Sequence, residues 1–374
     1  MHYFQPFANQ VLHRTKESAL GTLRITDKGL NAHLKAAFTR EFGKDECLLS
    51  PPVFEQTFGW KPGAIKFKDL KNDPFTESFL RVLSEAEKYD FSSEIYPYEH
   101  QLKAWEVLTN PIPKSAIITS GTGSGKTECF MMPILNDLIQ EYECFKTPLI
   151  GVRALFLYPL NALINSQKER LDAWTKQFKE GVRFCLYNGN TKERKYDVRK
   201  EQVEAPNQIL SRELLREEPA PILLTNATML EYMLVRQQDA PILDISKKHQ
   251  TLRWIVLDEA HTYVGSQAAE IALLLRRVVH AFGKNSEDIR FIATSATIAG
   301  DEAKKELRSY LAALAGIDPS RVEVITGERV WEVLNHKIME EDLSLEELSQ
   351  IDLGQQISSR RFEALASHKI ARKI

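Results

Sequence analysis

Short apolar runs that alternate with helical patterns constrain the fold of this 374-residue chain most strongly. The runs are apolar throughout, which is typical of strands buried on both faces of a sheet. They lie at residues 116–120, 154–159, 183–187, 222–226, 254–258, 290–296 and 322–326. Strands that alternate with helices predict an α/β fold with a mainly parallel sheet. Ligands of such sheets bind beyond the carboxyl ends of the strands.

Apolar residues between these runs recur with the spacing of a helix. The clearest example spans residues 270–282, and residues 303–314 form a second amphipathic candidate. A further helix is expected to begin near residue 126. Pro133 falls inside it and should kink the helix or end its first part.

Changes in composition divide the chain into three parts. Residues 1–92 are punctuated by prolines and glycines and predict a small accessory region. Its aromatic side chains suit either a hydrophobic core or a platform for stacking bases, and the core is favoured. Residues 93–328 carry the α/β pattern. Residues 329–374 turn polar and then basic, which indicates a linker or the start of an inserted or second domain.

The overall composition excludes several classes of protein. Net charge is −2, so any binding of nucleic acid requires a local basic patch. The 4 cysteines form no CxxC pair, which argues against a zinc site or a disulfide framework and favours a cytoplasmic location. The N-terminus does not resemble a signal peptide, and no apolar run is long enough to span a membrane, so no membrane partner is expected.

Residues 120–127 read Ser-Gly-Thr-Gly-Ser-Gly-Lys-Thr, between an apolar run and a helix. This is the context of a phosphate-binding loop, in which glycines let backbone N–H groups and a helix N-terminus face the phosphates. We expect Lys126 to reach the β- and γ-phosphates and the Thr127 hydroxyl to bind Mg²⁺. Upstream, the amide of Gln101 suits the N6/N7 edge of adenine. The predicted ATP-binding residues are Gln101, Thr122, Gly123, Ser124, Gly125, Lys126 and Thr127.

A second motif, Asp258-Glu259-Ala260-His261, ends the apolar run at 254–258. Because Mg²⁺ prefers oxygen ligands and keeps several waters, Asp258 is expected to hold it partly through water, together with Thr127. Glu259 is the expected general base, and Lys126 completes the catalytic set. His261 is expected to couple this site to a neighbouring strand.

Two hydroxyls, those of Ser295 and Thr297, end the next apolar run. They could hydrogen-bond the acidic motif and report its state. An ordinary Ser/Thr turn explains the same residues equally well.

Taken in order, these motifs resemble the first RecA-like domain of superfamily 2 DEAD/DEAH-box (DExH) helicases. The resemblance covers residues 93–328 and rests on Gln101, 120–127, 159–167, 225–230, 258–261 and 295–297. The stretch that follows Asp258 resembles bacterial helicases of the MrfA/YprA type. The N-terminal segment resembles large helicases of anti-phage defence systems, which implies partners from such a system.

The resemblance implies a motor that uses ATP and Mg²⁺ to translocate on or unwind nucleic acid, with DNA favoured over RNA. It also implies contacts with the nucleic-acid backbone, which loops at strand ends are suited to make. The residues concerned are Pro159, Asn161, Gln167, Thr225 and Asn226. Relatives often carry Thr and a basic residue where this chain has Leu160 and Asn161.

Helicases of this superfamily hydrolyse ATP between two RecA-like domains, and the second domain supplies an arginine finger worth roughly 10³–10⁵ in rate. No matching segment follows Thr297. We therefore expect this chain alone to turn ATP over poorly. The second RecA-like domain would come from the rest of a longer protein or from a partner subunit.

Two other functions stay open. One is an ATP-responsive nucleic-acid-binding subunit without hydrolysis of its own, against which the intact Glu259 argues. The other is a P-loop ATPase of a different class, against which Gln101 and residues 159–167 argue.

Overall fold

The protein, represented by a computed structural model, forms two compact units, Met1–Phe58 and Gly59–Ile374. The structure describes residues 4–38, 58–71, 73–121, 123–159, 161–295 and 300–330. The first unit contains two helices, α1 (Phe4–Leu23) and α2 (Lys28–Ala37). Lys35 of α2 forms an ion pair with Glu17 of α1, with 3.4 Å between the charged atoms.

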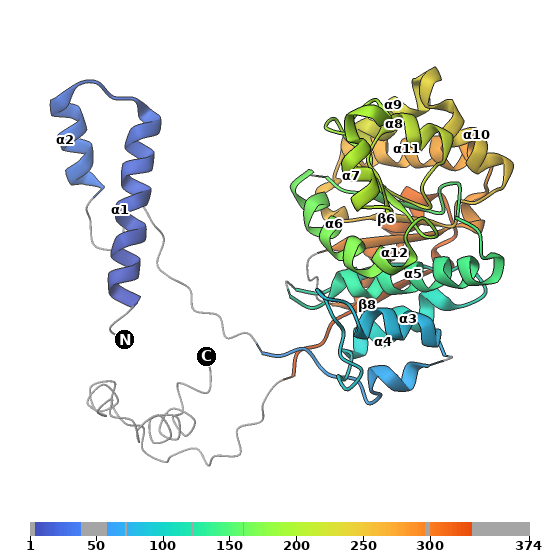
Figure 1. Ribbon diagram of the computed structural model, residues 1–374. Coiled ribbons are helices and arrows are strands. Elements are labelled where there is room, and N and C mark those ends of the chain that lie inside the picture. The colour runs from blue at the N-terminus through green and yellow to red at the C-terminus, as the bar shows by residue number, and fades with distance from the viewer. Residues whose placement is uncertain are drawn as a thin grey trace, which may run out of the picture. The chain divides into compact units, whose positions relative to one another are not determined.

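The second unit contains an eight-stranded parallel sheet with the order β4-β3-β5-β2-β6-β7-β1-β8. Its strands lie between layers of helices (Figure 1). Its strands are β1 (Ser115–Thr119), β2 (Ala154–Leu157), β3 (Phe184–Leu186), β4 (Gln208–Ile209), β5 (Ile222–Thr225), β6 (Trp254–Leu257), β7 (Arg290–Ser295) and β8 (Val322–Thr326). The predicted parallel α/β fold is confirmed. The two-residue strand β4 was not predicted, because it is too short to carry a pattern.

Helices cover both faces of this sheet. They are α3 (Glu77–Ser84), α4 (Glu99–Thr109), α5 (Lys126–Phe145), α6 (Asn161–Thr175), α7 (Arg199–Glu204), α8 (Arg212–Glu217), α9 (Ala227–Val235), α10 (Ala240–Lys248), α11 (Ser266–Ala281) and α12 (Asp301–Ala315). Side chains of α3, α4 and α5 form one hydrophobic core, and side chains of α9, α11 and α12 form the other. Along β1, Ile118 belongs to the first core and Ile117 to the second, as expected for a strand buried on both faces.

Two details of the helices bear on the sequence-based expectations. Helix α5 runs from Lys126 to Phe145 and does not end at Pro133. No helix in the described part of the chain is long and apolar enough to cross a membrane.

The aromatic residues between Gly59 and residue 92 belong to the core of the second unit. Phe67, Phe75 and Phe79 are at most 1% exposed. The rings of Phe67 and Phe75 lie 6.1 and 5.1 Å from Trp105 of α4, measured between ring centroids. The core interpretation is therefore confirmed for these three residues. The compact unit begins at Gly59, well before the boundary expected at residue 93, because these rings complete its core.

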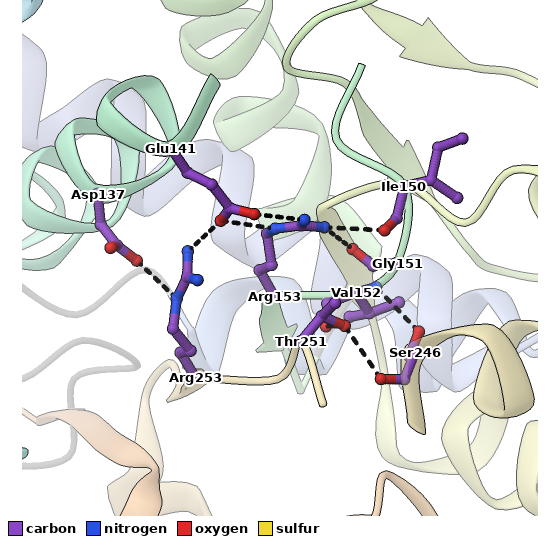
Figure 2. A network of polar contacts seen from close by, with 9 residues as sticks. All are labelled: Asp137, Glu141, Ile150, Gly151, Val152, Arg153, Ser246, Thr251 and Arg253. Atoms are coloured by element: carbon purple, nitrogen blue, oxygen red, sulfur yellow. Dashed lines mark hydrogen bonds and ion pairs between the residues drawn. The ribbon is translucent and has the colours of Figure 1, made fainter. Parts of the chain in front are cut away.

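A network of charged residues joins the amino ends of β2 and β6 to α5 (Figure 2). The Arg153 guanidinium donates two hydrogen bonds to the Glu141 carboxylate, at 2.9 and 2.5 Å. Arg253 donates to Glu141 at 2.7 Å and to Asp137 at 3.0 Å. The network lies at the amino ends of these strands, opposite the carboxyl ends where ligands are expected.

Candidate functional site

The phosphate loop connects the carboxyl end of β1 to the first turn of α5. Gly125 precedes the helix with a φ of 74°, a left-handed conformation that favours glycine. The Lys126 ammonium donates to the Ser120 carbonyl oxygen at 2.9 Å, and the hydroxyls of Ser120 and Ser124 lie 2.5 Å apart. These contacts within the loop hold it in a compact conformation. Thr122 lies outside the described residues.

The first turn of helix α4 is hydrogen-bonded to the phosphate loop. Gln101 accepts a hydrogen bond from the Tyr98 N–H at 3.0 Å and donates from its amide nitrogen to the Gly125 carbonyl at 3.3 Å. The Nε2 atom of His100 lies 2.8 Å from the Ser124 carbonyl oxygen. Burial lowers the pKa of His100, so we infer a neutral ring that donates from Nε2. Sequence reasoning placed Gln101 here but missed His100.

The acidic motif lies two strands away from the phosphate loop, with β7 between β6 and β1. Thr294 of β7 bonds to both acidic residues. Its hydroxyl donates to the Asp258 carboxylate and accepts from the Glu259 N–H at 2.9 Å. We expected Ser295 and Thr297 in this position. Thr297 lies outside the described residues, and the buried Ser295 hydroxyl has no hydrogen-bond partner in the part of the chain that the structure describes.

Burial and the neighbouring charge of Glu259 both raise the pKa of Asp258. The hydrogen bond from Thr294 and the positive charge of Lys126 lower this pKa. Glu259 adopts a φ of 50°, a strained conformation for a residue with a side chain. The Nδ1 atom of His261 lies 3.3 Å from the Glu259 carboxylate.

A cavity of about 660 Å³ unites the predicted ATP-binding residues with the expected base. Its lining includes Gln101, residues 123–127 and Glu259. Arg170 of α6 reaches the same cavity and forms an ion pair with Glu128, with 3.2 Å between the charged atoms. No sequence motif pointed to Arg170, because a single arginine on a helix carries no signal.

The residues expected to contact nucleic acid lie beyond the carboxyl ends of β2 and β5. Asn226 caps α9 by accepting from the Met229 N–H at 2.9 Å. Thr225 is fully buried and donates its hydroxyl to the Tyr187 carbonyl at 2.8 Å, so its side chain is not on the surface where we expected it.

The other three expected contacts follow β2 along the chain. Pro159 is partly exposed just beyond the strand. Asn161 begins α6, but its side chain lies outside the description. The Oε1 atom of Gln167 in α6 is buried without a hydrogen-bond partner among the described residues.

A phosphate loop after one strand and a carboxylate pair after another, in a parallel sheet, define a P-loop nucleotide-binding fold. The chain matches the DEAD/DEAH box helicase family over residues 98–305, which is more than half of its length. The chain therefore belongs to this family, and its α/β unit is RecA-like. Family membership also removes the interpretation as a P-loop ATPase of another class.

Similar proteins include the Druantia protein DruE of Escherichia coli, 27% identical over 85% of this chain and 22% of DruE. The uncharacterised ATP-dependent helicase YprA of Bacillus subtilis is 27% identical over 66% of this chain and 28% of YprA. The chain thus spans about a quarter of the length of these relatives. A solved structure of the DUF1998 helicase MrfA bound to DNA is also similar, with 24% identity, a TM-score of 0.48, and coverage of 71% of this chain and 30% of that one.

Proposed function

We propose that this chain is the ATP-binding half of a nucleic-acid-dependent ATPase that translocates on or unwinds DNA. The observation that carries the proposal is the shared cavity, which brings Gln101, the phosphate loop and Glu259 together. A loop built to bind phosphates and a carboxylate suited to act as a base are the two parts that phosphoryl transfer to water requires.

The side chains present fit ATP with Mg²⁺. Thr127 lines the cavity, and the Asp258 carboxylate is oriented by Thr294, so one hydroxyl and one carboxylate are available to the metal ion. Mg²⁺ is commonly held by one or two carboxylates together with phosphate oxygens and water. When bound, the ion neutralises charge that develops on the phosphates during transfer.

The chain's own residues would divide the work as follows. Lys126 leaves the Ser120 carbonyl to bind phosphate, and Glu259 orients a water and accepts its proton. His261, beside Glu259, and Thr294, which bonds to both acidic residues, would hold the base in place. Gln101 would bind adenine through its amide.

The preference for DNA and a role in anti-phage defence rest on resemblance. Similarity to DruE over 85% of the chain supports the second point. Backbone contacts are proposed for Pro159, Asn161, Gln167 and Asn226, whereas the buried side chain of Thr225 is left out. Deleting the gene should raise phage sensitivity, and unchanged sensitivity would count against the defence role.

A second RecA-like domain, from elsewhere in the protein or from a partner subunit, is part of the proposal because it would bring the arginine finger. The test is nucleotide binding and ATP turnover by this chain, with single-stranded DNA, single-stranded RNA or neither. Lys126→Ala should abolish binding. Glu259→Gln should preserve binding and remove any remaining turnover.

The outcomes separate the proposed motor from its rival. Binding with slow turnover that rises when a second domain is added supports half a motor. Binding that responds to nucleic acid but never leads to turnover, even with that domain, supports an ATP-responsive subunit without hydrolysis. Absence of nucleotide binding in the unmodified chain contradicts both.

A further inference from the structure

Segments far apart in the sequence meet beside the phosphate loop. Residues 59–63 lie antiparallel to residues 327–330, with a backbone bridge between Trp60 and Arg329 and backbone hydrogen bonds of 2.9 and 2.8 Å. On their other side, residues 59–63 bond to residues 97–99, which lead into α4, at 2.7 and 3.0 Å. We name these three segments the clasp.

The indole ring of Trp60 packs directly against the phosphate loop. A Cβ atom at Gly121 would lie 3.2 Å from one ring carbon, and a Cβ atom at Gly327 would lie 2.8 Å from another. The ring, together with the Arg329 guanidinium beside Gly121 and Ser120 beside Gly327, fills the space that side chains at these two positions would take. It also meets the ring of His100 edge-on at 5.7 Å, and His100 in turn bonds to the Ser124 carbonyl.

Arg329 holds this ring from the side of the chain that follows β8. Its guanidinium lies 3.9 Å from the centre of the Trp60 ring, and Trp60 is only 8% exposed. A cation over a shielded aromatic face is more strongly attracted than one in open water. The Lys61 ammonium adds ion pairs to Glu99 and Glu328 at 3.0 and 3.6 Å, but these side chains are exposed and contribute little.

We propose that Trp60, held by Arg329, is a positioning residue for the phosphate loop. A loop with left-handed glycines keeps its N–H groups in one arrangement only when its surroundings support it. Trp60 supports it directly at Gly121 and indirectly through His100. Because such coupling is reciprocal, a change in the clasp alters nucleotide affinity, and bound nucleotide stabilises the clasp. The clasp thereby links the phosphate loop to the segment at the start of this unit and to the segment that follows β8.

The first experiment needs no nucleotide and compares Arg329→Ala with a matched control, Arg290→Ala, in the full chain. The Arg290 guanidinium lies 4.9 Å from the centre of the Trp254 ring. This contact is at the amino ends of β7 and β6, away from the phosphate loop. Hydrogen exchange of the amides at 120–127 should be faster in Arg329→Ala and unchanged in Arg290→Ala. Trp60→Ala should behave like Arg329→Ala, and Trp60→Phe should keep part of the protection. Unchanged exchange in Arg329→Ala overturns the proposal.

The second experiment measures ADP affinity and rests on the proposed function. Arg329→Ala should weaken binding by about twofold to thirtyfold, the range of a cation–π contact, and Arg290→Ala should not. Faster loop exchange with unchanged ADP affinity would overturn the coupling. If the unmodified chain binds no ADP while Arg329→Ala still speeds loop exchange, the proposed function fails and the positioning role stands. If Trp60→Ala does not fold, Arg329→Ala and Trp60→Phe are sufficient for both experiments.

Discussion

At the residue scale, the Thr294 hydroxyl satisfies two buried polar groups of the acidic motif at once. Thr294→Val keeps the shape of the side chain but leaves the Asp258 carboxylate and the Glu259 N–H without this partner. We expect a loss of about 1–3 kcal/mol in the free energy of unfolding, the cost of unsatisfied buried groups. The pKa of Asp258 should rise further, and nucleotide binding should need more Mg²⁺. Urea denaturation and Mg²⁺ titrations measure the two effects.

The neighbouring residue provides the control for this prediction. Ser295→Ala removes a buried hydroxyl that has no hydrogen-bond partner within the described chain, so it should change stability and Mg²⁺ dependence little. Equal effects of Thr294→Val and Ser295→Ala would contradict the role of Thr294.

Thr294 and Ser295 also show what cannot be predicted from the sequence alone. The apolar run at 290–296 predicted β7, and its hydroxyls predicted a contact with the acidic motif. Which hydroxyl makes it depends on the register with β6, where Ala293 stands opposite Leu257 and Thr294 therefore follows beside Asp258, and on which way each side chain points from the strand. A single sequence carries no information about that register. The phosphate loop and Asp258–Glu259 were predictable because their chemistry requires those residues in that local order.

At the scale of elements, the Arg153–Glu141 pair ties β2 to α5 (Figure 2). Burial alone would raise the pKa of Glu141, but Arg153 and Arg253 together lower it. Glu141→Gln breaks a largely buried pair and should reduce the free energy of unfolding by about 3–5 kcal/mol at neutral pH. Glu87→Gln breaks an exposed pair with Lys176 and should cost under about 1 kcal/mol.

The pH dependence of the Glu141→Gln effect follows from the lowered pKa of Glu141. The stabilisation is complete above the pKa of Glu141 in the unfolded chain and is lost as pH falls through the lower folded-state value. The difference in the free energy of unfolding between the unmodified chain and Glu141→Gln should therefore be constant from neutral pH down to about pH 5 and shrink below it in denaturation curves. A difference that stays constant would show that the loss arises from packing, not from charge.

At the scale of the whole molecule, the predicted order of strands and helices is confirmed, whereas the boundary of the compact unit lies elsewhere. Composition suggested residue 93, because the regular alternation begins there. The aromatic residues before it have no periodic pattern, so the sequence indicated a core without indicating which one. Only the packing of Phe67 and Phe75 against Trp105, and of Phe79 against Phe75, assigns them to the RecA-like unit.

Two truncations distinguish these boundaries. A chain of residues 59–374 keeps all three phenylalanines and should unfold cooperatively. A chain of residues 93–374 loses them, and since each large core aromatic is worth about 3–5 kcal/mol, the total loss matches the whole stability of a typical domain, about 5–15 kcal/mol. It should aggregate or bind a hydrophobic dye, with no sharp melting transition. If residues 93–374 instead melt sharply at the same temperature as residues 59–374, the aromatic segment is an accessory after all, and the clasp that begins at Gly59 cannot be required for the phosphate loop to fold.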